Sequence, residues 1–249
     1  KNKKLKIIYG DLNNFQLLRK AVKNQDMIFH FGGMSGINES LKQPLASAEI
    51  NIISTIKLLD LATKFKIKTF IYASSIYVNS EQGGFYKTSK KATEDYIDEY
   101  KKRFNLNYTI LRFGTIYGIR ESRENSVNNI IKHAIKTKRV IYPANKKNLR
   151  EYINVIDAAK ATVEVIKNKY KNKYLIISGK QKIPVVVLMR TIKKLMKIKT
   201  KILYKNDKIA GHYISKPNTF KPRAGKRLKL NKYISLTEGI LSILKEKNF

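Results

Sequence analysis

The hydrophobic residues of this chain form short apolar runs separated by longer segments with helical spacing. Four apolar runs predict strands, at residues 5–9, 27–31, 70–74 and 108–113. Three segments with apolar residues three or four positions apart predict helices, at residues 13–23, 46–65 and 86–104. Strands that alternate with helix-length segments are typical of an α/β fold, in which helices cover both faces of a doubly wound parallel sheet.

The pattern changes after residue 118. Four more helices are expected, at residues 125–137, 155–166, 185–196 and 236–245, and three short strands, at residues 140–142, 174–178 and 201–204. Residues 205–232 are polar and rich in Pro, Gly and Lys, which predicts a surface loop. We therefore expect a main domain over residues 1–120. Residues 121–249 are expected to form mainly a small C-terminal lobe over the ligand, with elements that return to the main sheet.

Polar or glycine residues follow each predicted strand of the main domain. They are Asp11, Gly32-Gly33, Ser74-Ser75 and Gly114-Thr115. Ligands of such sheets bind in the crevice outside the carboxyl ends of the strands. Four separate segments thus predict one binding cleft.

The third predicted strand and the helix after it carry a set of residues suited to proton transfer. Tyr86 and Lys90 are four residues apart, so both project from one face of the helix. A neighbouring ammonium lowers the pKa of a tyrosine, which makes the phenolate a usable base. The hydroxyl of Ser75 can hydrogen-bond the same substrate oxygen. The alternative is an ordinary helix start with solvated side chains and a serine that caps a turn.

Composition excludes several classes of site. The chain of 249 residues has no cysteine and three histidines without ligand spacing, so we expect no metal site. We interpret His30 as a buried histidine of the core. The longest uncharged runs, residues 27–38 and 69–80, have 12 residues each and are too short to cross a membrane.

The formal net charge of +34 is the most unusual property of the chain. Its lysines are scattered over nearly every segment, which favours a general compositional bias over a binding patch. We therefore expect no specific nucleic-acid partner, although a positive surface attracts anions without sequence preference. The alternative is a basic nucleic-acid-binding protein.

Several motifs, in order, resemble the extended short-chain dehydrogenase/reductase family, the NAD-dependent nucleotide-sugar epimerases and dehydratases. The resemblance covers roughly residues 5–165 and follows the pattern of UDP-glucose (UDP-galactose) 4-epimerases. It rests on Gly10-Asp11-Leu12, His30-Phe31-Gly32-Gly33, Gly36 to Ser40 with Pro44-Leu45, the Tyr86-x-x-x-Lys90 pair, Leu111 to Gly118, and Arg150 to Asp157.

The resemblance implies a Rossmann-like sheet, NAD as cofactor and a nucleotide-diphosphate sugar as substrate. The implied catalytic residues are Ser75, Tyr86 and Lys90. The implied cofactor contacts are Asp11, Leu12, Phe31, Gly32, Gly33, Asn51, Ser74, Tyr86, Lys90 and Phe113. The implied substrate contacts are Ser75, Thr115, Arg150 and, as a second phosphate-binding candidate, Arg223. A cytoplasmic homodimer is also implied. Asp11 could instead cap the first helix, and Arg150 could be a solvated charge.

The implied reaction is epimerisation through a transient keto-sugar. Tyr86, held as phenolate by Lys90 and the positive nicotinamide, takes a proton from a sugar hydroxyl while Ser75 holds the oxygen. Dehydratases of the family carry an acid pair after the catalytic serine, where this chain has Ile76-Tyr77. A reductase, dehydratase or decarboxylase of the same family remains an alternative, as does an inactive scaffold protein.

Three departures from the family pattern qualify this expectation. No glycine-rich GxGxxG turn is present, so we expect the first βαβ unit to be missing and the sheet to be N-terminally truncated. The 249-residue piece alone is expected to fold poorly and to be inactive. Thr115 replaces the usual Asn and Ser35 replaces a Lys, so the identity of the sugar stays open.

Overall fold

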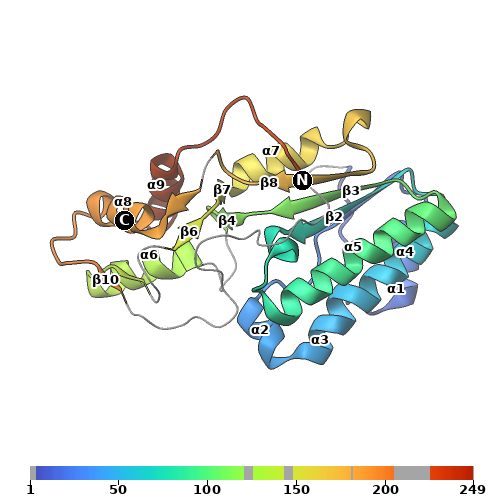
Figure 1. Ribbon diagram of the computed structural model, residues 1–249, viewed down its shortest axis with the longest axis horizontal. Coiled ribbons are helices and arrows are strands. Elements are labelled where there is room, and N and C mark those ends of the chain that lie inside the picture. Colours follow the sequence, from blue (N-terminus) through green and yellow to red (C-terminus); the bar gives the residue numbers. More distant parts are fainter. Residues whose placement is uncertain (1–3, 121–125, 143–147, 181, 205–224, 249) are drawn as a thin grey trace.

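A five-stranded parallel sheet forms the centre of the protein (Figure 1). The computed structural model describes residues 4–120, 126–142, 148–180, 182–204 and 225–248. The strand order is β1-β2-β3-β8-β11, and every neighbouring pair is parallel. The strands are β1 (Met27–His30), β2 (Thr69–Ser75), β3 (Tyr108–Phe113), β8 (Lys173–Ile177) and β11 (Lys226–Arg227). The predicted α/β class with a parallel sheet is confirmed.

Helices cover both faces of this sheet because successive strand residues point to opposite sides. On β2, Phe70 and Tyr72 pack with α1 (Phe15–Val22), α4 (Ser54–Lys64) and α5 (Gly84–Phe104). Ile71 lies in a second apolar cluster with α7 (Val155–Glu164), on the opposite face (Figure 1). Burying each such side chain contributes about 1.5–3 kcal/mol. This double layer explains why β2 and β3 are apolar almost throughout.

The predicted helix at residues 46–65 is interrupted by a π turn. The helical stretch consists of α3 (Pro44–Ala48), a π-helical turn (Glu49–Ile53) and α4. A further helix, α2 (Ile37–Lys42), precedes it and was not expected from the pattern. π turns inside α-helices often occur at functional sites. Here the turn contains Asn51, whose side chain is buried.

The C-terminal residues build a second core beside the sheet, at the left of Figure 1. Its elements are α6 (Ser126–Thr137), α8 (Val185–Leu195), α9 (Leu236–Glu246), β5 (Ile141–Tyr142) and β10 (Leu203–Tyr204). Two short pairs connect it to the sheet: β4 (Thr115–Tyr117) with β7 (Tyr152–Asn154), and β6 (Leu149–Arg150) with β9 (Ile183–Pro184). Short 3₁₀ turns follow β2 (Ile76–Asn79) and α7 (Asn168–Tyr170). β8 and β11 return to the main sheet.

Two of the expected elements are wrong. Residues 5–9 form no strand in the structure, and Leu5, Ile7 and Tyr9 are exposed. An extended segment needs a neighbouring strand for its backbone hydrogen bonds, and none of the described residues provides one. Within the predicted loop 205–232, residues 226–227 instead form β11 and Leu228 is buried. This strand has two basic residues and no apolar alternation, so only its pairing with β8 reveals it.

No helix in the described ranges combines the length and the apolar composition that crossing a bilayer requires.

Candidate active site

The predicted site residues meet at the carboxyl edge of the sheet. Ser75 and Phe113 are neighbours in register at the ends of β2 and β3. The chain leaves β1 at His30 and passes directly into the Phe31–Gly33 turn at the same edge. Phe31 is half exposed, and its ring makes an edge contact with the ring of Phe113 at 6.4 Å between centroids. Three strand ends therefore form one wall, as the sequence predicts.

Gly32 and Gly33 let the backbone come close to two other predicted site residues. A Cβ atom on Gly32 would lie 2.5 Å from Cδ1 of Leu12. Gly33 has φ +153°, and a Cβ there would lie 2.7 Å from Oδ1 of Asn51 and 3.6 Å from Nζ of Lys90. Any larger residue at either position would clash with Leu12 or Asn51, so the turn can pack this closely only because both residues are glycine. It is a backbone surface beside an ammonium, suited to the close approach of an anionic or polar ligand.

Asn51 joins this glycine turn to the helix that carries Tyr86. Its Oδ1 accepts a hydrogen bond from the Met34 amide at 2.8 Å, and its Nδ2 donates to the Met34 carbonyl at 3.0 Å. The same Nδ2 donates to Oγ of Ser89 at 2.9 Å, and Ser89 donates to the carbonyl of Tyr86 at 2.9 Å. The π turn thus fixes the glycine loop relative to the first turn of α5.

Tyr86 and Ser75 are close together in this site. The side chain of the half-buried Tyr86 is close enough to Ser75 for the two hydroxyls to interact, and its ring makes an edge contact with Tyr77 at 6.5 Å. Burial raises the pKa of Tyr86, and the hydrogen bond with Ser75 offsets part of that rise. The sequence predicts a lowered pKa from Lys90 alone, and that expectation is wrong for the chain by itself. Desolvation of the phenolate outweighs the favourable interaction with Ser75.

Lys90 is buried between the sheet and the glycine turn. Its Nζ donates to the carbonyl of Ala73 at 2.9 Å and lies 4.8 Å from the centre of the Tyr72 ring. Burial lowers the pKa of Lys90 to about 8, and the nearby Glu94 carboxylate partly opposes this. The ammonium is therefore close to its ionisation point at neutral to mildly alkaline pH, which makes it sensitive to its neighbours.

Two further predicted cofactor contacts, Asp11 and Ser74, lie in different surroundings. The exposed Asp11 accepts a hydrogen bond from the Asn13 amide at 2.7 Å, while Asn14 caps α1. The hydroxyl of Ser74 donates a hydrogen bond to Oε1 of Glu94 at 2.6 Å. The roles in binding predicted for these residues stay predictions.

On the lobe side, Thr115 begins β4 and its amide donates to the carbonyl of Glu151 at 2.8 Å. Arg150 is buried, and its Nη1 donates to the carbonyl of Leu149 at 2.8 Å. Arg150 is therefore not the solvated charge of the alternative interpretation. Arg223 lies outside the described residues.

Sequence reasoning missed two ion pairs at this edge, one buried and one partly buried. Glu94 pairs with Arg112 at 2.6 Å, and Glu151 pairs with Arg227 at 2.9 Å. A signal was present for the first pair, because Arg112 interrupts the apolar run of β3 and a buried charge requires a partner. No comparable signal marked the second pair, whose partners are 76 residues apart.

His30 gives a testable pH dependence of stability. Burial lowers the pKa of His30 to about 3, and the charge of Lys90 adds to the effect. Below pH 6.5 the unfolded chain binds a proton that the folded chain does not, so stability falls as the pH falls from 6.5 toward 3. We expect a loss of about 2 kcal/mol from this residue between pH 7 and pH 5. His30→Gln should remove that part of the loss.

Urea unfolding at pH 7 and pH 5 measures this difference. His133→Gln, at an exposed position on α6, is the matched control. An equal pH-dependent loss in the wild type and in His30→Gln would contradict the prediction.

Comparison with known proteins identifies relatives of this chain. A UDP-glucuronate 4-epimerase from Thermodesulfobacterium geofontis is 23% identical over 255 residues, which cover 96% of this chain and 78% of the relative. A protein assigned to the UDP-glucose 4-epimerases from Methanocaldococcus jannaschii is 25% identical over 199 residues, covering 72% of this chain and 65% of that relative. The chain thus spans less than two thirds of the second relative.

Solved structures share the fold at low sequence identity. The UDP-glucuronic acid 4-epimerase of Bacillus cereus, in complex with UDP-glucuronic acid and NAD, matches with a TM-score of 0.83 and 19% identity over 100% of this chain and 83% of that one. The UDP-glucose 4-epimerase of Thermotoga maritima with UDP-glucose matches with a TM-score of 0.79 and 20% identity, covering 100% and 87%. The predicted Rossmann-like fold is confirmed.

The sequence profile of the NAD dependent epimerase/dehydratase family matches residues 1–177. This range contains β1 to β3, the glycine turn and the Tyr86–Lys90 helix. The chain belongs to the NAD dependent epimerase/dehydratase family.

Proposed function

We propose that the protein is an NAD-dependent epimerase that inverts C4 of a nucleotide-diphosphate sugar. One observation carries the proposal: the interacting Ser75 and Tyr86 side chains and the buried Lys90 lie together beside the bare backbone of the Gly33 turn. The relatives named as UDP-glucuronate and UDP-glucose 4-epimerases support the same reaction class. UDP-glucose and UDP-glucuronate are therefore the first substrates to test.

The residues at the glycine turn fit the cofactor that the family implies. A side chain on Gly33 would clash with Asn51, so the backbone of the turn is bare there, and Nζ of Lys90 lies 3.6 Å from where a Cβ would be. The residues that would hold NAD are Asp11, Leu12, Phe31, Gly32, Gly33, Asn51, Ser74, Tyr86, Lys90 and Phe113. When bound, NAD accepts a hydride from the sugar, returns it, and brings a positive charge to the site.

The chain itself handles the proton. Tyr86 accepts the proton of the sugar hydroxyl, and Ser75 holds the same oxygen by a hydrogen bond. Lys90 favours the phenolate, but burial raises the pKa of Tyr86 in the chain alone. The charge on the cofactor is therefore needed in addition to Lys90 before Tyr86 becomes a competent base. Arg150, Thr115 and Arg223 remain the proposed substrate contacts.

The epimerase assignment is separated from its alternatives by one assay. The full-length protein is incubated with NAD and, in turn, UDP-glucose, UDP-galactose, their N-acetyl forms and their uronic acids, and products are identified by NMR. Interconversion of one pair supports the proposal, and no interconversion of any pair contradicts it. Loss of water, loss of carbon dioxide or net NADH consumption would indicate a dehydratase, decarboxylase or reductase. The acid pair used by dehydratases is absent, because the buried Ile76 and then Tyr77 follow Ser75.

A basic nucleic-acid-binding protein is the non-enzyme alternative. It predicts salt-sensitive RNA or DNA binding and no bound NAD. Binding of nucleic acid at different salt concentrations and the content of bound NAD can be measured on the same preparation of the protein.

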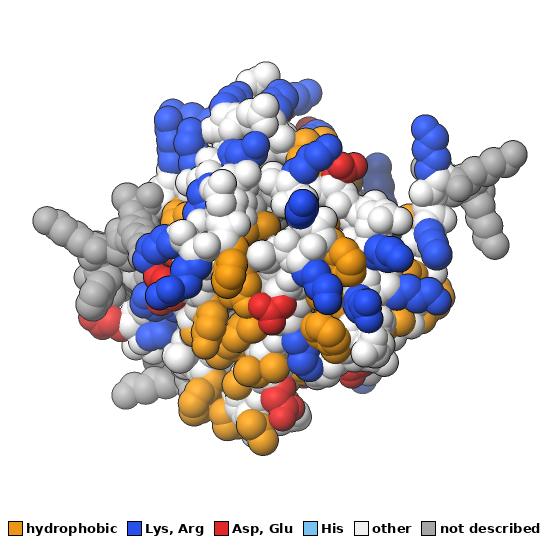
Figure 2. All heavy atoms as spheres, turned by 90° about the vertical axis from the view of Figure 1, so that its right-hand side faces the viewer, with side chains coloured by type: hydrophobic (Ala, Val, Ile, Leu, Met, Phe, Trp, Pro, Cys, Tyr) orange, Lys and Arg blue, Asp and Glu red, His pale blue; other side chains and the backbone are white. Residues whose placement is uncertain are grey.

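We further propose a cytoplasmic homodimer that supplies sugars for polysaccharide synthesis. Figure 2 views the molecule from the side of α1, α4 and α5 and shows apolar side chains gathered on a surface otherwise rich in Lys and Arg. The elements on this side carry exposed apolar residues: Leu45, Ile53, Tyr96 and Phe104. An exposed apolar surface favours association between copies. Light scattering on the full-length protein tests the dimer.

A further inference from the structure

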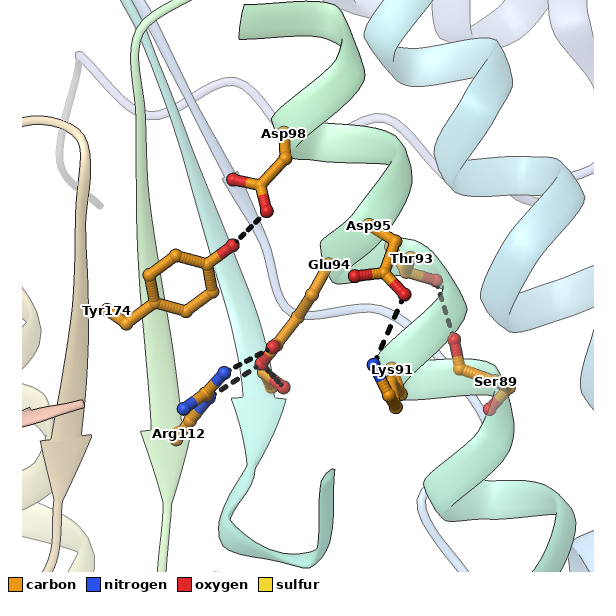
Figure 3. A network of polar contacts seen from close by, with 9 residues as sticks. Ser89, Lys91, Thr93, Glu94, Asp95, Asp98, Arg112 and Tyr174 are labelled. Carbon is orange, nitrogen blue, oxygen red and sulfur yellow. Dashed lines mark hydrogen bonds and ion pairs between the residues drawn. The ribbon is translucent and has the colours of Figure 1, made fainter. Parts of the chain in front are cut away.

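The carboxylate of Glu94 joins three elements of the site. Glu94 is on α5, one turn after Lys90, and is buried. Its Oε1 accepts hydrogen bonds from Oγ of Ser74 at 2.6 Å and from Nε of Arg112 at 3.0 Å, and its Oε2 accepts from Nη2 of Arg112 at 2.6 Å (Figure 3). Both oxygens are therefore used, and α5 is fixed to the ends of β2 and β3.

A second carboxylate on the same helix extends this network to β8. Asp98, one turn further along, accepts a hydrogen bond from the hydroxyl of Tyr174 (Figure 3). It also accepts one from the hydroxyl of Tyr108 at 2.8 Å. The guanidinium of Arg112 lies 4.6 Å from the centre of the Tyr174 ring. The side of Arg112 that faces away from Glu94 is thus packed as well, so the guanidinium cannot move to follow a displaced helix.

Three consecutive residues of β2 connect this network to the proposed catalytic groups. The carbonyl of Ala73 accepts a hydrogen bond from the Lys90 ammonium, the hydroxyl of Ser74 donates one to Glu94, and the side chain of Ser75 interacts with that of Tyr86. Glu94 and Tyr86 are on one rigid helix. The contact between Ser74 and Glu94 therefore sets how far the Ser75 hydroxyl lies from the Tyr86 ring.

Stability alone does not explain a buried pair of this kind. Glu94 and Arg112 are 3% and 2% exposed, and the cost of removing two charges from water largely cancels their attraction. A buried ion pair does, however, define one geometry, because both partners lose their interactions if either moves.

The charge of Glu94 also acts on Lys90. The titratable groups that act on Lys90 or contact it are His30 on β1, Tyr72 on β2 and Glu94 on α5. Of these three, Glu94 is the acidic residue, and it forms an ion pair with Arg112. It favours the charged form of Lys90 against the effect of burial.

We propose that Glu94 is a positioning residue for the reaction, which holds Ser75 in register with Tyr86 and keeps Lys90 in its ammonium form. The proposal rests on the proposed function, since it assigns Glu94 a role in the same proton transfer. It also gives Arg112 a purpose that neither cofactor nor substrate contact provides, and it gives Ser74 a second one beside its proposed cofactor contact.

The first test is Glu94→Gln in the full-length protein, which keeps the shape and removes the charge. We expect kcat to fall about 10- to 100-fold, because small displacements of catalytic groups cost this much. KM should change little, and the alkaline limb of the kcat profile should move to lower pH by about one unit. Asp95→Asn is the matched control, since Asp95 is the next residue, is exposed and pairs only at the surface with Lys91 at 3.3 Å. A folded Glu94→Gln enzyme with wild-type kcat and pH profile overturns the proposal.

Ser74→Ala separates position from charge. It removes the hydroxyl anchor and leaves Glu94 charged, so kcat should fall while the alkaline limb stays in place. An unchanged kcat in this variant would refute the positioning role of the Ser74–Glu94 contact.

Two further measurements keep the test decisive. If Glu94→Gln does not fold, the double variant Glu94→Met/Arg112→Met leaves no buried charge unpaired, and it should fold yet show the same loss of kcat and the same pH shift. Wild-type kcat in the folded double variant rejects the proposal.

Urea unfolding between pH 7 and pH 10.5 monitors the ionisation of Lys90 in the absence of substrate. The stability gain should begin near pH 8 in the wild type and at lower pH in Glu94→Gln. If the wild type converts no sugar, the proposed function fails, whereas this unfolding measurement still decides whether Glu94 controls the charge of Lys90.

Discussion

Replacing Tyr86 with Phe in the full-length protein is expected to lower kcat by about 10²- to 10⁴-fold. The substitution removes one oxygen, the group that we propose accepts the proton of the sugar hydroxyl. The ring keeps its edge contact with Tyr77, so the helix start and the pocket wall remain. Stability should change by about 1 kcal/mol, the usual net value of one hydrogen bond. NAD binding should persist, because the Gly33 turn and Lys90 are untouched.

The measurement is kcat for the sugar pair that the wild type interconverts, with NAD binding followed separately. Tyr170→Phe is the matched control: Tyr170 is next to α7, and its hydroxyl makes only a long contact of 3.5 Å with Glu164. A Tyr86→Phe enzyme within threefold of the wild-type kcat would exclude Tyr86 as the base.

Lys90→Met is expected to have opposite effects on catalysis and on stability. Without the ammonium the phenolate of Tyr86 loses its nearest positive charge, so kcat should fall about 100-fold or more. Burial has lowered the pKa of Lys90 from 10.5 to about 8, so at pH 7 the charged form is costly in the folded state. Met removes that cost, and stability at pH 7 should rise by about 3 kcal/mol.

The sign of this effect also predicts a pH dependence. Between pH 8 and pH 10.5 the unfolded chain binds more protons at Lys90 than the folded chain, so the wild type gains stability as the pH rises through this window. Lys90→Met lacks that gain. Lys91→Met is the control, because Lys91 is the next residue and forms an exposed pair with Asp95. A Lys90→Met protein that is less stable than the wild type at pH 7 would contradict the prediction.

The two predictions together describe a site in which a residue proposed for catalysis lowers the stability of the folded protein. We expect Lys90 to lower the stability of the fold at neutral pH while serving the proposed chemistry, as is common for groups in active sites. Stabilisation of the protein together with loss of turnover in one variant would be difficult to explain if Lys90 were merely structural.

Some residues of the site could be predicted from the sequence because they are only a few positions apart or lie at the end of a strand. Tyr86 and Lys90 are one helical turn apart, and Ser75 ends an apolar run, so their approximate meeting follows from helix geometry and from the edge of a parallel sheet. Arg112 within the apolar run of β3 indicates that a buried acid must lie nearby. Which acid, and that it also holds Ser74, depends on how α5 packs on β2.

Other parts depend on contacts between distant residues. Residues 5–9 have the composition of a strand, but a strand also needs a neighbour, and the described chain offers none there. Residues 226–227 have no strand pattern and still become β11, because β8 presents an unpaired edge to them. The π turn at Asn51 could likewise not be predicted, because the spacing of apolar residues over residues 46–65 is that of one continuous helix.

The sequence by itself predicted most of the strands and helices in their order, the parallel sheet, and Ser75, Tyr86 and Lys90 as the proposed chemical groups. These follow from spacing along the chain. Only the tertiary structure decided how those groups are charged. Whether Tyr86 has a raised or a lowered pKa depends on the balance between desolvation, which is a property of the packed site, and the charges of Lys90 and Glu94, which only packing brings near. That balance, rather than the motif, sets the chemistry that the Tyr86–Lys90 helix can perform.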